Sequence, residues 1–170
     1  MPRLVILASL LILAACAAPA SPAVSPQPGA SPQDRAEVLA TIQSFLDGLR
    51  ARDTTAMAQH VDSLTRLTLL RPARGGGTQV WVLTASEFMR AATRPGEPGI
   101  DEPIRNPVVH VSGDLASVWA EYQVRRDGAV THCGYDAFHL ARRGGRWKLL
   151  NVSDTFQQTG CGPAWPVEGR

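Results

Sequence analysis

The sequence has almost no net charge. Its 17 lysines and arginines are nearly balanced by 15 aspartates and glutamates, which gives a formal net charge of +2 over 170 residues. The basic residues are scattered, and the pairs Arg125–Arg126 and Arg142–Arg143 lie beside turn signals, where solvated turns account for them. Binding of nucleic acid needs a clustered basic surface. We therefore expect no nucleic-acid partner.

The common signatures of catalysis and cofactor binding are also missing. The sequence contains no Ser-His-Asp nucleophile elbow, no paired catalytic carboxylates, no Walker motif and no zinc signature. The run Gly75-Gly76-Gly77 lacks the Lys-Ser/Thr of a phosphate-binding loop, so it is interpreted as a flexible turn. These absences predict a protein without a cofactor or a bound metal.

The apolar run at the start of the chain, Leu4 to Leu13, is too short to cross a bilayer of about 30 Å as a helix. With Arg3 before it, the run fits the hydrophobic region of a signal peptide covering residues 1–15. The following Leu13-Ala14-Ala15-Cys16 resembles the lipobox of bacterial lipoproteins, in which the cysteine is lipidated. This resemblance implies a membrane anchor on Cys16. Ala17, rather than an aspartate, follows Cys16, and in this class of lipoproteins that residue implies a location in the cell envelope, at the outer membrane facing the periplasm.

After the signal peptide, the amino-acid composition distinguishes a tether, a domain and a tail. Residues 16–33 hold the cysteine and a tether of Pro, Ala and Ser, which cannot bury a core and should act as an extended spacer. One domain is expected over residues 34–162, followed by a tail over 163–170. An alternative is an ordinary cleaved signal peptide with an incidental cysteine.

Helical periodicity dominates the first part of the domain. A capped amphipathic helix is expected over residues 33–51, and a short second helix, capped by Asp53, over 54–61. The capping box from Thr84 to Glu87 begins a third helix. Short strands are expected around residues 67–70 and 80–83.

In the second part of the domain, apolar and polar residues alternate with a period of two. Turn signals near residues 113, 127 and 144 separate four strands, expected over residues 103–111, from about 115, over 129–141 and over 146–155. Short connections predict an antiparallel meander. Strands this long must bend, and a bent sheet with helices on its concave face encloses a pocket.

Three helices followed by a long meander resemble the nuclear transport factor 2-like superfamily. The resemblance covers residues 33–156 and rests on Asp53 after the opening helix, the turn Gly113–Ala116, and the closing hairpin Gly134–Leu140 and Gly145–Leu149. It implies an α+β cone in which three N-terminal helices pack on a long curved antiparallel sheet. The superfamily includes ketosteroid isomerase, scytalone dehydratase, and polyketide cyclase-like and lumazine-binding-like proteins, so the fold alone does not specify a reaction.

Two cysteines remain after Cys16. Folding the last hairpin places Cys133 near Phe156, and Cys161 follows only a few residues later, so a disulfide between Cys133 and Cys161 is expected in an exported domain. The alternative is a reactive or metal-binding thiol pair near His132, but no Cys-x-x-Cys or His-x-x-x-His spacing supports it.

The best candidate for chemistry is Asp136. By alternation it shares a strand face with His132, Phe138 and Leu140, and the apolar members indicate the concave face. A carboxyl buried there gains a raised pKa and is suited to acid–base work, with His132 as its partner, as the resemblance to ketosteroid isomerase implies. The alternative is that Asp136 caps the backbone or pairs with an arginine.

Three other side chains are candidate ligand contacts beside Asp136 and Phe138. Tyr122 lies on the apolar face of its strand, Trp81 is an aromatic residue that either stacks on a ligand or packs against the first helix, and Asp154 ends the last strand. Each has a structural alternative: Tyr122 as a core aromatic and Asp154 as a turn residue. His110 and His139 have the parity of the opposite face, so a scytalone dehydratase-like pair of histidines is incomplete.

The opposite, convex face carries Trp119, Glu121 and Gln123, and its aromatic residue predicts a homodimer contact. The favoured function is a lipid-anchored envelope domain that binds a small apolar or aromatic ligand, or a protein partner, in the cone. One alternative is a cofactor-free isomerase, dehydratase or cyclase that uses Asp136. Another is an accessory lipoprotein whose cone is filled by side chains.

Overall fold

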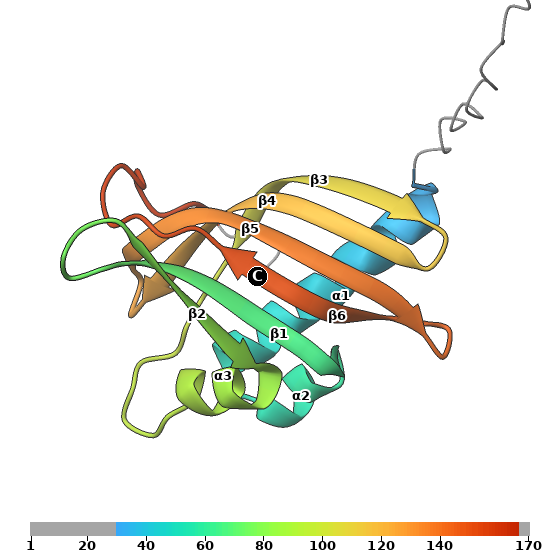
Figure 1. Ribbon diagram of the computed structural model, residues 1–170, viewed down its shortest axis with the longest axis horizontal. Helices are drawn as coiled ribbons and strands as arrows, with labels where there is room; N and C mark the ends of the chain where they lie inside the picture. Colours follow the sequence, from blue (N-terminus) through green and yellow to red (C-terminus); the bar gives the residue numbers. More distant parts are fainter. Residues whose placement is uncertain (1–29, 167–170) are drawn as a thin grey trace, which may run out of the picture.

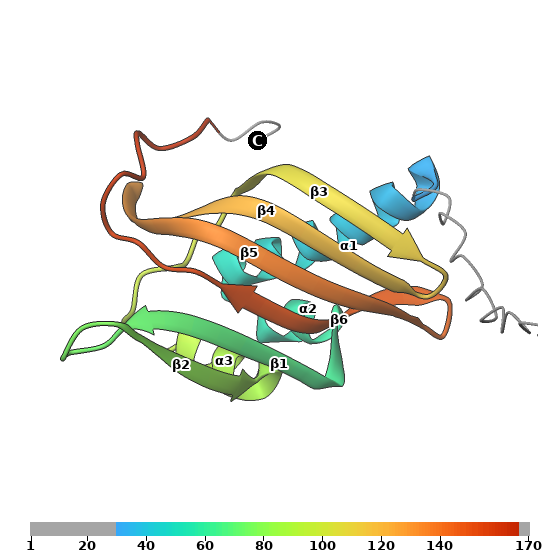
Figure 2. The ribbon, with the colours of Figure 1, turned by 45° about the horizontal axis from the view of Figure 1, so that its top comes forward.

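A computed structural model describes residues 30–166, which form one curved sheet with helices on one face (Figures 1 and 2). Within these residues the sheet has six strands in the order β2-β1-β6-β5-β4-β3. The helices are α1, α2 and α3, as expected, and α1 crosses behind the strands in Figure 1. None of the helices in this range is both long and apolar enough to cross a membrane. The predicted signal peptide, the predicted lipidation site Cys16 and most of the predicted tether lie outside the described residues.

Helix α1 spans Pro32–Ala51 and follows the predicted periodicity. Ser31 caps it, with its hydroxyl oxygen accepting from the Asp34 N–H, and Pro32 occupies the first helical position. The buried face carries apolar side chains one turn apart, which are Val38, Ile42, Phe45, Leu46 and Leu49. This face forms the central part of the core against the sheet.

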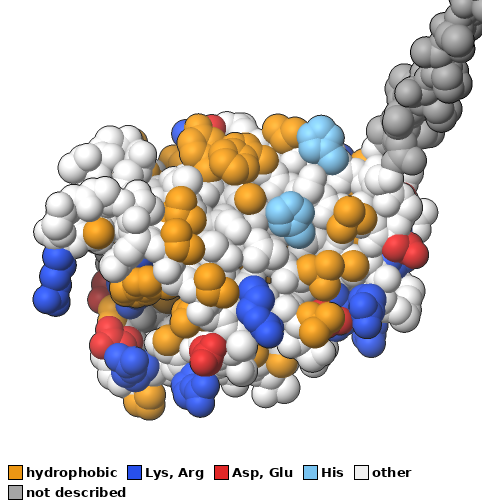
Figure 3. All heavy atoms as spheres, in the orientation of Figure 1, with side chains coloured by type: hydrophobic (Ala, Val, Ile, Leu, Met, Phe, Trp, Pro, Cys, Tyr) orange, Lys and Arg blue, Asp and Glu red, His pale blue; other side chains and the backbone are white. Residues whose placement is uncertain are grey.

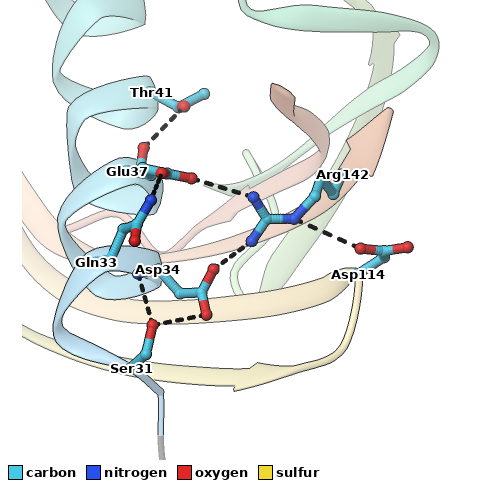
Figure 4. Close-up of polar contacts among 7 residues, drawn as sticks. All are labelled: Ser31, Gln33, Asp34, Glu37, Thr41, Asp114 and Arg142. Atoms are coloured by element: carbon cyan, nitrogen blue, oxygen red, sulfur yellow. Dashed lines mark hydrogen bonds and ion pairs between the residues drawn. The ribbon is translucent and has the colours of Figure 1, made fainter. Parts of the chain in front are cut away.

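Arg142, at the end of strand β5, ties the start of α1 to the sheet (Figure 4). Its guanidinium forms ion pairs with Asp34, Glu37 at 3.1 Å and Asp114 at 3.4 Å. Asp34 lies in the first turn of α1, where negative charge also interacts favourably with the helix dipole. The sequence interpretation of Arg142 as part of a solvated turn was therefore wrong, because three acids from two elements converge on it.

Helices α2 (Thr54–Ala58) and α3 (Ala85–Ala92) are short. Asp53 caps α2 as predicted, but α2 ends at Ala58 rather than at residue 61, because Val61 already pairs with Leu149 in the sheet. The predicted capping box of α3 is present in full: Thr84 accepts from the Glu87 N–H, and the Glu87 carboxylate accepts from the Thr84 N–H.

Strands β1 (Val61–Pro72) and β2 (Thr78–Thr84) form an antiparallel hairpin, and both are longer than predicted. Strand β1 pairs with β6 in parallel, so the sheet is mixed rather than wholly antiparallel. Turn signals predict the direction of strands joined by short connections. The β1–β6 pair joins segments from opposite ends of the domain, and no turn specifies its direction.

The other four strands form the predicted meander: β3 (Ile104–Ser112), β4 (Leu115–Arg126), β5 (Ala129–Arg143) and β6 (Arg146–Asp154). Register shifts interrupt the β4–β5 ladder near Arg125 and the β5–β6 ladder near Leu140. Between these points β5 alternates regularly. Asp136, Phe138 and Leu140 therefore share the helix-covered face, and each is at most 1% exposed.

The residues after β6 form a strap, which we define as residues 157–166, that returns along the end of the sheet (Figure 2). The predicted disulfide between Cys133 and Cys161 is confirmed, with a Cα–Cα distance of 5.5 Å. The Gln123 side-chain amide donates to the carbonyls of Cys161 and Pro163, and its oxygen accepts from the Trp165 N–H. The strap thus covers Gln123, which is fully buried on the outer face.

Candidate functional site

A cavity of about 220 Å³ lies between the helices and the concave face of the sheet. Most of its wall is apolar and comes from α1, α3, the loop before β3, and strands β1, β4, β5 and β6. The apolar lining residues are Phe45, Leu46, Leu49, Leu67, Leu69, Phe88, Ile100, Val124, Phe138 and Val152. The polar lining residues are Arg71, Glu102, Arg126, His132, Asp136 and Asp154.

The strand register places two of the acids side by side. Asp136 on β5 is the direct partner of Asp154 on β6, and Asp154 is in turn the partner of Leu69 on β1. Side chains directly opposite one another on neighbouring strands have Cβ atoms about 5 Å apart. Arg71 follows Leu69 by two residues and therefore points to the same face. Three consecutive strands thus build one polar wall.

Asp154 is neutralised by Arg71. The two arginine Nη atoms each donate to one carboxylate oxygen of Asp154 at 2.7 Å, which is the bidentate geometry of a strong ion pair. The Leu70 N–H also donates to Asp154 at 3.2 Å. Arg71 further packs over the Phe156 ring, 4.9 Å from its centroid. Asp154 therefore has its partners within the protein.

Asp136 has none. Its side chain is fully buried, and neither carboxyl oxygen has a hydrogen-bond partner among the described residues. Burial raises the pKa of Asp136 well above its usual value, the charges of Glu102 and Asp154 add to this, and Arg71 opposes it. A raised pKa favours the protonated carboxyl, which can donate a hydrogen bond as well as accept one.

Glu102, in the loop before β3, is another acid that lines the cavity. Burial of its carboxyl and the neighbouring Asp154 charge raise the pKa of Glu102 to about 8, and Arg71 acts in the opposite direction. The charge of Glu102 also raises the pKa of Asp136, and both acids respond to the charges of Asp154 and Arg71.

His132 lines the cavity from β5, four residues before Asp136. Its Nδ1 lies 3.1 Å from the Thr131 hydroxyl, and its ring packs 4.5 Å from the Phe156 ring, centroid to centroid. Burial and the positive charges of Arg71 and Arg126 lower the pKa of His132 to about 4. His132 is therefore neutral at physiological pH. No direct contact joins its ring to Asp136, because four strand residues span about 13 Å.

The structure brings four of the predicted site residues together and leaves two aside. His132, Asp136, Phe138 and Asp154 line the cavity. Tyr122 is buried behind the lining, and its hydroxyl donates to the Thr155 carbonyl at 2.6 Å, which corresponds to the structural alternative for this residue. Trp81 is half-exposed on β2 at the edge of the sheet and does not line the cavity.

Sequence reasoning missed three polar lining residues, Arg71, Glu102 and Arg126. Alternation from Leu67 through Leu69 predicts that Arg71 faces inward, so a usable signal was present for it. Glu102 lies in a loop without periodicity, and no local pattern marks it. Within residues 30–166, no group of three or more histidines, cysteines or acids is arranged to hold a metal ion.

The architecture matches many solved structures at low sequence identity. An NTF2-like protein of unknown function from Pseudomonas putida is 15% identical with a TM-score of 0.59, covering 83% of this chain and 100% of that one. An NTF2-like protein from Cytophaga hutchinsonii is 14% identical with a TM-score of 0.58, covering 71% and 96%. The association domain of C. elegans CaMKII is 19% identical with a TM-score of 0.56, covering 72% and 95%.

The chain therefore has the nuclear transport factor 2-like fold, an α+β cone whose helices enclose a pocket on a curved sheet. The resemblance predicted from the opening helix, the Gly113 turn and the closing hairpin is confirmed at the level of the fold. No protein-family model matches the sequence, and no curated protein matches it either.

Proposed function

We propose that the domain binds a small, mostly apolar ligand in the cavity, with the ligand's polar group against Asp136. An apolar cavity of about 150 Å³ accommodates benzene, so a cavity of about 220 Å³ has room for one ring with a small substituent. The observation that supports this most directly is the buried Asp136 carboxyl without a protein partner.

The energetics of Asp136 explain why a ligand is expected there. A buried polar group without a hydrogen bond destabilises a protein by about 1–3 kcal/mol, and natural proteins keep few such groups. Asp136 shares its strand face with Phe138 and Leu140, which belong to the hydrophobic core, so packing alone does not require a carboxyl there. A ligand hydroxyl, carbonyl or amine beside the carboxyl would supply the missing partner and orient the ligand.

The proposal is tested with benzyl alcohol as a neutral one-ring probe, titrated into the protein and followed by NMR chemical shifts. We expect saturable binding to the wild type. Val152→Phe places a ring inside the cavity and should abolish it. Val108 is half-exposed on the outer face, so the matched substitution Val108→Phe should leave binding unchanged. Equal binding by Val152→Phe and wild type would contradict the cavity as the site.

A second candidate function is cofactor-free acid–base catalysis in the same cavity. It is favoured by the raised pKa of Asp136 and by the neutral state of His132. The two groups lie four residues apart on β5, too far to touch one another, so they would act on separate atoms of a substrate. In that case Asp136→Asn would remove turnover while the fold stays intact.

We also propose that lipid on Cys16 anchors the protein in the cell envelope, at the outer membrane facing the periplasm. The lipobox-like sequence before Cys16 and the disulfide, which is typical of oxidising compartments, support this location. The tether would then hold the cavity domain away from the bilayer.

A homodimer through the outer sheet face is a further proposal. Trp119 stacks on Tyr135 with ring centroids 5.3 Å apart, and both rings are nearly half exposed beside Val108. Several separate hydrophobic groups are visible on this face in Figure 3. The similarity in fold to the CaMKII association domain supports the homodimer proposal. Gln123 takes no part, since the strap covers it. A monomer in sedimentation velocity would contradict the proposal.

A further inference from the structure

The polar end of the cavity contains more acids than basic groups that pair with them. Arg71 and Asp154 form a bidentate pair and cancel one another. Glu102 and Asp136 remain: both oxygens of Asp136 are buried without a hydrogen-bond partner among the described residues, and Arg71 acts on each acid only through its charge. The cavity wall therefore holds two acids for which the protein supplies no cation of their own.

The other polar groups facing this end do not supply one. His132 on β5 is neutral above about pH 5, because burial and nearby arginines lower its pKa to about 4. Tyr122 on β4 is neutral, since burial raises its pKa, and its hydroxyl is directed to the Thr155 carbonyl. Arg126 on β4 is charged, but it donates to the Pro98 carbonyl at 3.3 Å and acts on His132, and it is not among the charges that shift the pKa of Glu102 or Asp136.

We propose that Glu102 and Asp136 together bind the ammonium group of a small one-ring amine whose ring occupies the apolar part of the cavity. The inference rests on the proposed function, that the cavity accepts a small ligand, and names the ligand class. The Asp136 carboxyl is fully buried, unpartnered and part of the cavity wall, so it is positioned to accept from the ligand.

The chemistry of the ammonium group fits this end of the cavity. It carries three N–H donors and no acceptor, which matches two carboxyls acting as acceptors, one of which, Asp136, has no partner among the described residues. Hydrogen bonds between charged partners are stronger than those to a neutral hydroxyl, especially where water is excluded. A bound cation also reverses the electrostatic penalty that keeps the acids protonated. The protonated amine therefore enters as the acid pair releases protons to water.

The release of protons on amine binding determines how the affinity for the amine depends on pH. Below the pKa of Glu102, about 8, Glu102 is largely protonated, and burial raises the pKa of Asp136 in the same direction, so an entering ammonium must displace protons. The affinity for an amine should therefore rise as the pH is raised from about 5.5 to about 8, and calorimetry in buffers of different ionisation enthalpy should detect proton release. A neutral ligand of the same shape releases no proton, so its affinity should change little.

The test compares three probes of nearly equal size and different charge: benzylamine, benzyl alcohol and benzoate. In NMR titrations at about pH 7.5 we expect benzylamine to bind at least about tenfold more tightly than benzyl alcohol, with benzoate weakest. Asp136→Asn and Glu102→Gln should each remove most of the preference for the amine. Glu97→Gln, in the exposed loop after α3, is the matched control and should preserve it.

Each outcome is decisive. If benzyl alcohol binds in the cavity as tightly as benzylamine, the amine inference fails while the proposed function stands. If benzoate binds most tightly, the arginines rather than the acids determine the ligand class. If none of the probes saturates, both proposals fail. Should Asp136→Asn not fold, Glu102→Gln alone still tests the preference, because Glu102 lies in a loop outside the ladders.

Discussion

Asp136 combines two properties that a purely structural residue rarely has: it is fully buried and it has no protein partner. Its alternation with Phe138 and Leu140 predicted the burial from sequence. The missing partner was not predictable, because it depends on Glu102, Arg71 and Asp154, which come from three other elements. Sequence alternation assigns a residue to a face, whereas its electrostatic surroundings follow from tertiary packing.

The first prediction concerns stability at this residue. The folded pKa of Asp136 is raised above the unfolded value of about 3.9, so folding favours the protonated form. Below about pH 4 the carboxyl is protonated in both states and contributes no difference. As the pH rises, the unfolded state ionises freely and the folded state does not, so Asp136 increasingly destabilises the protein. Asp136→Asn should therefore raise the free energy of unfolding by about 1–3 kcal/mol near pH 8.

The measurement is urea unfolding of wild type and Asp136→Asn at several pH values. The difference between them should shrink towards about pH 4. Glu102→Gln should show the same trend, levelling off near about pH 8, where Glu102 itself ionises in the folded state. A constant difference across this range, or a variant less stable than wild type near pH 8, would show that Asp136 is held by a favourable partner.

At the scale of elements, the strap is the feature that sequence reasoning anticipated only in part. Hairpin geometry predicted the Cys133–Cys161 link, and the structure contains it. The contacts beyond Cys161 were not predicted, because Pro163 and Trp165 carry no periodic pattern. The same limit explains the parallel β1–β6 pairing. Short-range signals determine turns, caps and hairpins, whereas pairing between distant segments depends on the whole packing arrangement.

The second prediction is that the disulfide stabilises the strap and the domain together. Cys161→Ser opens a loop with a sequence separation of 28 residues. The chain-entropy model assigns such a loop about 3.6 kcal/mol. We expect a loss of about 2–4 kcal/mol in the free energy of unfolding, together with faster amide exchange at the backbone of Cys133 and Gln157, which pair with each other.

The control for this measurement is Ser153→Ala on the neighbouring β6, which leaves the disulfide intact. Reduced wild type should match Cys161→Ser, because both lose the same link. If reduction leaves stability unchanged, the strap is held by its hydrogen bonds to Gln123 and by the stacking of Arg105 on Trp165.

At the scale of the whole molecule, the fold was predictable because its signals are repeated. Amphipathic periodicity in α1, the capping box of α3 and the turns near Gly113 and Gly144 all agree with one architecture. The cavity was predicted as a consequence of the curved sheet. Its size was not, since the volume depends on how ten apolar side chains fill the cone.

The third prediction concerns location. Cys16→Ser should prevent lipidation, so the variant should move from the detergent phase to the aqueous phase in Triton X-114 partitioning. The matched change Ser21→Ala, in the tether, should leave partitioning as in wild type. Equal detergent partitioning of Cys16→Ser and wild type would exclude Cys16 as the anchor.

The central claim is that the cavity beneath α1 is a ligand site, and intermolecular NOEs test it most directly. With benzyl alcohol bound to protein labelled at Leu and Val methyl groups, we predict NOEs from the probe's ring protons to Leu46, Leu69 and Val152, which line the cavity. Val108, on the outer face, should show none. Saturable binding with NOEs only to outer-face methyls, or no saturable binding at all, would contradict the account.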